Sequence, residues 1–182
     1  MTTSGTALRS PRIPLPIRCT TGSRPKVIFA REEDLMQNVT RTHSLPAHSI
    51  TRSSAAELVA TVRAAAENIG FEAAVAVTDA GGHLKAFERA DDVPFLAAEV
   101  AVDKAWTAAS FRTATHVWNS YVADPEVAPL SHHPRLMAVG GGYPVIELGE
   151  VTGGLGVSGG SAEQDRQAAE AGLRALGFEV PA

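Results

Sequence analysis

The sequence has little cysteine, few aromatic residues and no long hydrophobic run. Cys19 is the only cysteine among 182 residues, which excludes an internal disulfide and a thiolate-rich zinc site. No stretch approaches the roughly 18 consecutive apolar residues of a membrane span, and the first residues lack the apolar core of a secretory signal. We therefore expect a cytoplasmic protein with no membrane partner.

Positive charge is scarce after the first fifty residues. Up to Arg52 the chain has eight Lys/Arg and three Asp/Glu, a net +5, whereas from Ser53 onward it has eight and seventeen, a net −9. The acidic part has no cluster of Lys or Arg and would repel a phosphate backbone. This charge distribution excludes nucleic acid as a partner.

Residues 1–50 differ in composition from the rest. They hold five of the eleven prolines and show no sustained apolar period, so they cannot bury enough surface to offset the entropy of ordering. We predict a flexible extension over 1–50 and one folded domain over 51–182. The origin of the extension stays open between an organelle transit peptide, a flexible tail and a true start at Met36, and we favour the last two.

From Ser53 onward, apolar periodicity predicts secondary-structure elements in the order α-β-β-α-α-β-β-β-α. The expected helices cover 54–69, 95–111, 113–122 and 161–176, and the expected strands 72–78, 83–89, 135–139, 143–148 and 150–157. Hairpin-like groups of strands separated by helices favour antiparallel pairing. We therefore predict an α+β fold with a five-stranded antiparallel sheet flanked by helices.

Two glycine motifs overlap between residues 154 and 160. Residues 154–159 fit G-x-G-x-x-G, but the chain stops at Ala182, before the second strand and acidic residue that a dinucleotide site needs. Residues 156–160 fit G-x-S-x-G, but no histidine follows Ser158 to serve as the base. We expect the glycines to allow close packing and a sharp turn, and the amides around Ser158 and Gly159 to be able to hold an anion.

Lys104 lies on an alanine-rich face of the helix expected over 95–111. A lysine in such a stripe either extends its ammonium to the rim or is buried against a partner. Burial would lower its pKa and suit it to acid–base or anion-binding work. The pattern favours the rim position, and Thr107 follows one turn later.

His116 stands close in sequence to hydroxyl and tryptophan side chains. Thr115 precedes it, and Trp106 and Trp118 flank it at a distance that could place flat apolar surface beside it. Such a combination could receive an aromatic or porphyrin ligand. Tryptophans with this spacing are, however, more often part of a core.

Three long segments resemble the GlcG/HbpS family, which includes the C-terminal domain of PduO-type proteins. They are AVAVTDAGGHLKAFER, DKAWTAASFRT and GGGYPVIELGEVTGGLGVSGGSAEQDRQAAEAG, in unbroken order within residues 53–177. The resemblance implies an antiparallel sheet flanked by helices, assembly into homo-oligomers of up to eight copies, and, as in some members, binding of heme or a related tetrapyrrole.

The resemblance also implies a ligand site. The heme-binding members place an iron-facing hydroxyl at the position of Thr115, and His116 beside it is the stronger ligand chemically, because imidazole is the usual heme donor. The ring would lie against Trp106, Phe111 and Trp118. The chain departs from the secreted members in lacking an export signal, and from the common pattern in having Arg-Thr-Ala at 112–114 instead of a proline-containing turn.

Three functional hypotheses follow. The leading one is a cytoplasmic, homo-oligomeric heme- or tetrapyrrole-binding protein with Thr115 or His116 towards iron. The second is a cofactor-independent enzyme acting on an anionic metabolite, with Lys104 as proton donor or anchor, Thr107 beside it, and the amides of 156–161 binding the substrate. The third is a non-catalytic accessory subunit.

Overall fold

The computed structural model describes residues 45–181. Most of the extension predicted over 1–50 lies outside these residues, so its flexibility and the boundary at residue 50 stay predictions. Ile50 is buried, and its N–H donates to the carbonyl of Thr152 at 2.8 Å. The last residue before the predicted boundary is thus joined to the sheet.

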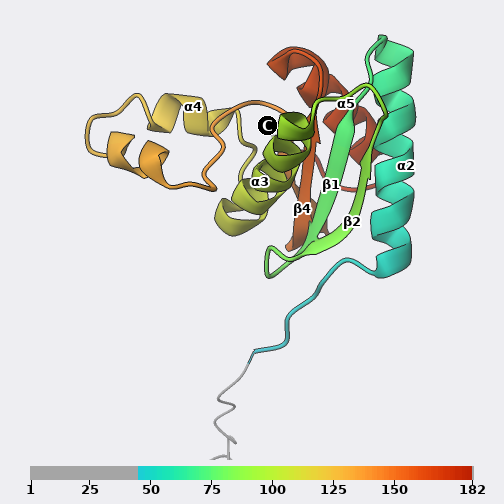
Figure 1. Ribbon diagram of the computed structural model, residues 1–182. Coiled ribbons are helices and arrows are strands. Elements are labelled where there is room, and N and C mark those ends of the chain that lie inside the picture. Colours follow the sequence, from blue (N-terminus) through green and yellow to red (C-terminus); the bar gives the residue numbers. More distant parts are fainter. Residues whose placement is uncertain (1–44, 182) are drawn as a thin grey trace, which may run out of the picture. The chain divides into compact units, whose positions relative to one another are not determined.

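A four-stranded antiparallel sheet forms the centre of the fold, in the order β2-β1-β4-β3. Its strands are β1 (Ala74–Asp79), β2 (Leu84–Arg89), β3 (Gly142–Glu147) and β4 (Glu150–Ser158), and the helices are α2 (Arg52–Ile69), α3 (Phe95–Phe111), α4 (Val117–Tyr121), the 3₁₀ helix η1 (Ala128–His132) and α5 (Ala162–Ala175). Helix α3 covers one face of the sheet, and α2 and α5 cover the other (Figure 1). No helix within residues 45–181 has the length and apolarity needed to cross a membrane.

The predicted five-stranded sheet and its element order are wrong, because residues 135–139 form no strand. Their backbone groups pair with side chains. The Thr107 hydroxyl donates to the carbonyl of Arg135 (2.9 Å) and accepts from the N–H of Met137 (3.0 Å), and the Thr115 hydroxyl donates to the carbonyl of Val139 (2.5 Å). Buried backbone groups need partners, and here two threonines supply what a neighbouring strand would have supplied. The order is therefore α-β-β-α-α-β-β-α, with η1 before β3.

The helix ends follow local signals in most places. Gly70 ends α2 with a φ of 99°, as its position predicts. Residues 161–164 have the Ser-x-x-Gln sequence of a capping box, and Ser161 and Gln164 form one at the start of α5. Residues 54–57 have the Ser-x-x-Glu sequence of a capping box, which predicts Ser54 as the N-cap of α2. The N-cap is instead Thr51, whose side chain accepts from the N–H of Ser54. The predicted helix over 113–122 shortens to α4, and Figure 1 shows this helix and η1 in a long excursion between α3 and β3.

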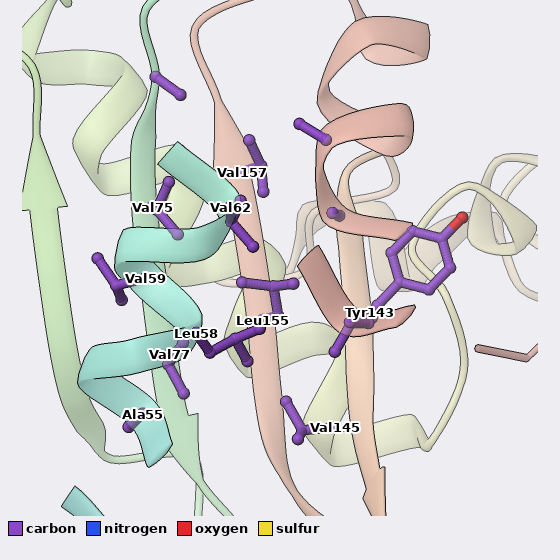
Figure 2. Close-up of a cluster of buried hydrophobic side chains, with 14 of the residues drawn as sticks. Ala55, Leu58, Val59, Val62, Val75, Val77, Tyr143, Val145, Leu155 and Val157 are labelled. Atoms are coloured by element: carbon purple, nitrogen blue, oxygen red, sulfur yellow. The ribbon is translucent and has the colours of Figure 1, made fainter. Parts of the chain in front are cut away.

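The larger hydrophobic core fills the space between the sheet and the α2–α5 pair (Figure 2). Val75 and Val77 of β1 and Leu155 of β4 meet Leu58 of α2 there, all with none of their surface exposed. Alternate residues of each strand point to opposite faces, which explains why only every second residue enters this core. The strands' other residues face α3.

Glycines in β4 allow α3 to lie directly on the sheet. A Cβ at Gly154 would stand 2.0 Å from the carbonyl oxygen of Ala105, and a Cβ at Gly156 would stand 2.0 Å from that of Ala101. These distances leave no room for a side chain. The expectation that the glycine-rich motif serves close packing is confirmed.

Candidate functional site

Lys104 is buried in the interior, 1% exposed, and is not at a rim. Its ammonium donates to the Asp165 carboxylate at 2.7 Å and to the carbonyl of Val157 at 2.7 Å. Desolvation lowers the pKa of Lys104 and raises the pKa of Asp165, and their mutual attraction opposes both shifts. The pair links α3 to α5 and to the end of β4.

The other residues predicted to act with Lys104 are also engaged in backbone hydrogen bonds. Thr107 is fully buried and holds residues 135–137, as described above. Past Ser158 and Gly159, the N–H of Gly160 donates to Asp165 (3.0 Å) and the N–H of Ser161 donates to Gln164 (3.0 Å). Side chains of α5 therefore accept hydrogen bonds from two of the backbone amides that the enzyme hypothesis assigned to the substrate.

The predicted aromatic contacts belong to two separate ring clusters. Trp106 stacks on His133, with ring centroids 5.5 Å apart and planes 5° apart, and the Arg135 guanidinium lies 4.7 Å from its ring centroid. Phe111 packs against Trp118 with centroids 4.3 Å apart. The structure shows no single wall made of all three predicted aromatic residues within 45–181.

Thr115 is fully buried, and its hydroxyl already has protein partners. In addition to the bond donated to Val139, it accepts from the N–H of Gly142 at 2.9 Å, and the N–H of Thr115 donates to the carbonyl of Gly142 at 2.9 Å. These bonds fix the turn that leads into β3. An iron ion at this hydroxyl would have to displace at least one of them.

His116 lines a hollow of about 410 Å³, which we call the His116 hollow. The first turn of α5, the start of α4 and the residues just before β3 surround it. Its other lining residues are Asn119, Ala138, Val139, Gly140, Ala162, Glu163 and Arg166. Its volume falls within the roughly 300–1,000 Å³ that is usual for small-molecule sites.

Two polar atoms of the residues lining the His116 hollow lack hydrogen-bond partners among residues 45–181. They are Nδ1 of His116 and Nε of Arg166, and both are buried. Buried polar atoms without partners are rare in folded proteins. The imidazole packs near Tyr143, with ring centroids 5.9 Å apart, and Arg166 is paired with Glu163. Because both atoms are buried, they are not open to the hollow, which combines an imidazole ring, the Arg166–Glu163 ion pair and apolar surface.

The family model described as "Haem degrading protein HbpS-like" matches residues 50–174. The chain belongs to this family. The GlcG/HbpS resemblance seen in the sequence is thereby confirmed.

Individual HbpS-like relatives agree with this assignment. The GlcG protein of Escherichia coli K12 is 34% identical over 109 residues, covering 60% of this chain and 81% of GlcG. The crystal structure of HbpS has a TM-score of 0.69 at 30% identity and covers 74% of this chain and 95% of its own. The crystal structure of a PduOC–heme complex has a TM-score of 0.66 at 30% identity and covers 75% of this chain and all of its own.

Sequence reasoning missed Glu163 and Arg166 as candidate site residues. They lie three residues apart in the first turns of α5, a spacing typical of an ordinary solvated pair on a helix surface. The available signal was their position directly after the glycine-rich segment, beside the helix start where we expected an anion.

Proposed function

We propose that this HbpS-like chain binds heme or a related tetrapyrrole in the His116 hollow, with His116 as the iron ligand. The observation that carries the proposal is that the His116 side chain lines a ligand-sized hollow between α5, α4 and the residues before β3. The HbpS-like family and the heme-bound PduOC neighbour support it.

The residues around the hollow fit such a ligand. Imidazole is a common axial ligand of heme iron, and Ala138, Val139 and Ala162 offer apolar surface for a flat ring. When bound, heme would supply the iron-centred chemistry, while the chain holds and orients it. Thr115 serves as a positioning residue in this proposal, because its hydroxyl fixes Val139 and Gly142 beside the hollow.

We also propose that the chain assembles with itself and works in the cytoplasm. Phe95 and Leu96 at the start of α3 are 76% and 61% exposed, and exposed neighbouring apolar side chains are typical of surfaces that other chains cover. The family resemblance suggests up to eight copies. The single cysteine suits a reducing compartment.

Replacing His116 with alanine should weaken heme binding by at least about tenfold. Loss of a residue that only supports a metal ligand costs about 10–100-fold in metal affinity, and loss of the ligand itself should cost no less. The measurement is a hemin titration followed by the Soret band, on variants whose fold is checked by circular dichroism. His132→Ala, which removes an exposed histidine on η1, is the matched control and should bind as the wild type does.

The same titration separates the two candidate iron ligands. A Soret shift that survives in His116→Ala but is lost in folded Thr115→Ala would assign the iron to the Thr115 hydroxyl. No Soret shift in the wild-type protein would overturn the proposed function. The enzyme hypothesis receives no support from Lys104, since both acceptors of its ammonium are protein atoms.

A further inference from the structure

The buried Lys104–Asp165 pair lies next to the walls of the His116 hollow without lining it. Neither residue belongs to the lining, and the two side chains are 1% and 3% exposed. Asp165 nevertheless stands in the first turns of α5, among the residues that form one wall. The α5 residues of this wall are Ala162, Glu163 and Arg166. A guest in the hollow would therefore sense the pair only through the position of α5.

The pair ties the start of α5 to the end of β4. The Lys104 ammonium donates to Oδ2 of Asp165 and to the carbonyl of Val157, both at 2.7 Å. The other carboxylate oxygen, Oδ1 of Asp165, accepts from the N–H of Gly160 at 3.0 Å. Hydrogen bonds to ionised groups are shorter and stronger than those between neutral groups. A single side chain of α3 thus holds the last residues of β4 and the first turns of α5 together.

The wall formed by residues 138–140 lies against the same pair. A Cβ at Gly141, the next residue, would stand 2.6 Å from the Cβ of Asp165 and 3.0 Å from Nζ of Lys104. A Cβ at Gly140 would stand 3.0 Å from the carbonyl oxygen of Ala162. Because no side chain intervenes at these glycines, the backbone of this wall rests directly on the pair and on the start of α5.

We propose that the Lys104–Asp165 pair sets the width of the His116 hollow by holding the start of α5 against residues 140–141. Resting on the proposed function, this inference makes Lys104 and Asp165 positioning residues for a guest that they do not touch. A gap of about 0.5–1 Å between packed atoms already loses about a quarter to a half of their dispersion attraction. Small shifts of α5 should therefore weaken the contact of Ala162 with a flat ring.

The test is a hemin titration of Lys104→Met/Asp165→Leu, followed by the Soret band. Apolar side chains often replace a buried ion pair without net loss of stability, so this variant removes the tether while the fold, checked by circular dichroism, is kept. It should bind hemin about two- to thirtyfold more weakly, the range for residues that modulate binding without contacting the ligand. The Soret maximum of the bound fraction should match that of the wild type, because His116 is unchanged.

Asp165→Asn is a second, milder variant that keeps the size of the side chain and removes its charge. It should weaken hemin binding by a smaller factor. Leu58→Ala is the matched control for a general loss of stability, because Leu58 is buried between α2 and the sheet and does not line the hollow. Folded Leu58→Ala should bind hemin as the wild type does.

The two proposals fail in different ways. If the wild type binds hemin and both pair variants bind it equally well, positioning by the pair is overturned and the heme site stands. Weakening by Leu58→Ala as large as that in the double variant would also overturn it, since stability alone would then explain the effect. A shifted Soret maximum in the double variant would do the same, because the pair would then act on the iron ligand. If the wild type binds no hemin, the proposed function itself is overturned.

Discussion

Replacing Lys104 with methionine is expected to lower the free energy of unfolding by about 3–5 kcal/mol, because it leaves the Asp165 carboxylate buried without its cation. Both side chains of the pair are almost inaccessible, at 1% and 3% exposed, so little solvent screening reduces this effect. Domains of this size are stable by only about 5–15 kcal/mol. Urea denaturation at pH 7, followed by circular dichroism, measures the loss.

The double variant Lys104→Met/Asp165→Leu is the control for this prediction. Apolar residues often replace a buried ion pair without net loss, but here the N–H of Gly160 would lose its acceptor on Asp165. We therefore expect the double variant to recover at least half of the stability lost in the single one. Wild-type stability in Lys104→Met would show that Asp165 finds another partner or reaches water.

Acidification gives a second readout of the same pair. Burial raises the pKa of Asp165 above its ordinary value, and without Lys104 only the hydrogen bond from the N–H of Gly160 would oppose that rise. A group whose pKa is raised by folding stabilises the protein below its unfolded pKa, and this contribution is lost as the pH rises through the folded value. The deficit of Lys104→Met relative to wild type should therefore shrink as the pH falls from 7 towards 4.

Lys104 illustrates what the sequence could and could not predict about the candidate site. Helical spacing placed it correctly on the alanine-rich face of α3, but its partner lies 61 residues away in the first turns of α5. Local periodicity carries no information about such a pair. Of the two readings weighed for Lys104, the favoured rim position is wrong and burial against a partner is correct, but the sequence did not identify Asp165 as that partner.

The fold shows the same division between local and long-range information. Turn residues and short apolar segments located all four observed strands, because both are local properties of the sequence. The false strand over 135–139 has an equally suitable pattern. Its backbone hydrogen bonds go to the hydroxyls of Thr107 and Thr115, and only the three-dimensional arrangement reveals that these side chains reach it.

Replacing Gly156 with alanine is expected to cost about 3 kcal/mol or more, which makes it the most damaging single-methyl change that we propose. The new Cβ would stand 2.0 Å from the carbonyl oxygen of Ala101 and 2.7 Å from the backbone nitrogen of Ala105. Both atoms belong to the backbone of α3 and cannot rotate away, so the helix must move off the sheet. Overpacking of this kind typically costs about 1–3 kcal/mol and sometimes more.

Gly81→Ala is the matched control, because its new Cβ would meet only side-chain atoms, the imidazole of His83 at 3.0 Å and the carboxylate of Asp79 at 3.3 Å. That ring is on an exposed side chain and can move, so we expect a change below about 1 kcal/mol, in line with the modest effect of glycine-to-alanine changes at permissive positions. Equal denaturation midpoints for the two variants would contradict the claim that Gly156 limits the approach of α3.

The displacement of α3 in Gly156→Ala should also reach the candidate site. Helix α3 carries Thr107, which holds residues 135–137 next to the wall of the His116 hollow. Gly156→Ala, but not Gly81→Ala, should therefore weaken hemin binding under conditions in which both variants remain folded.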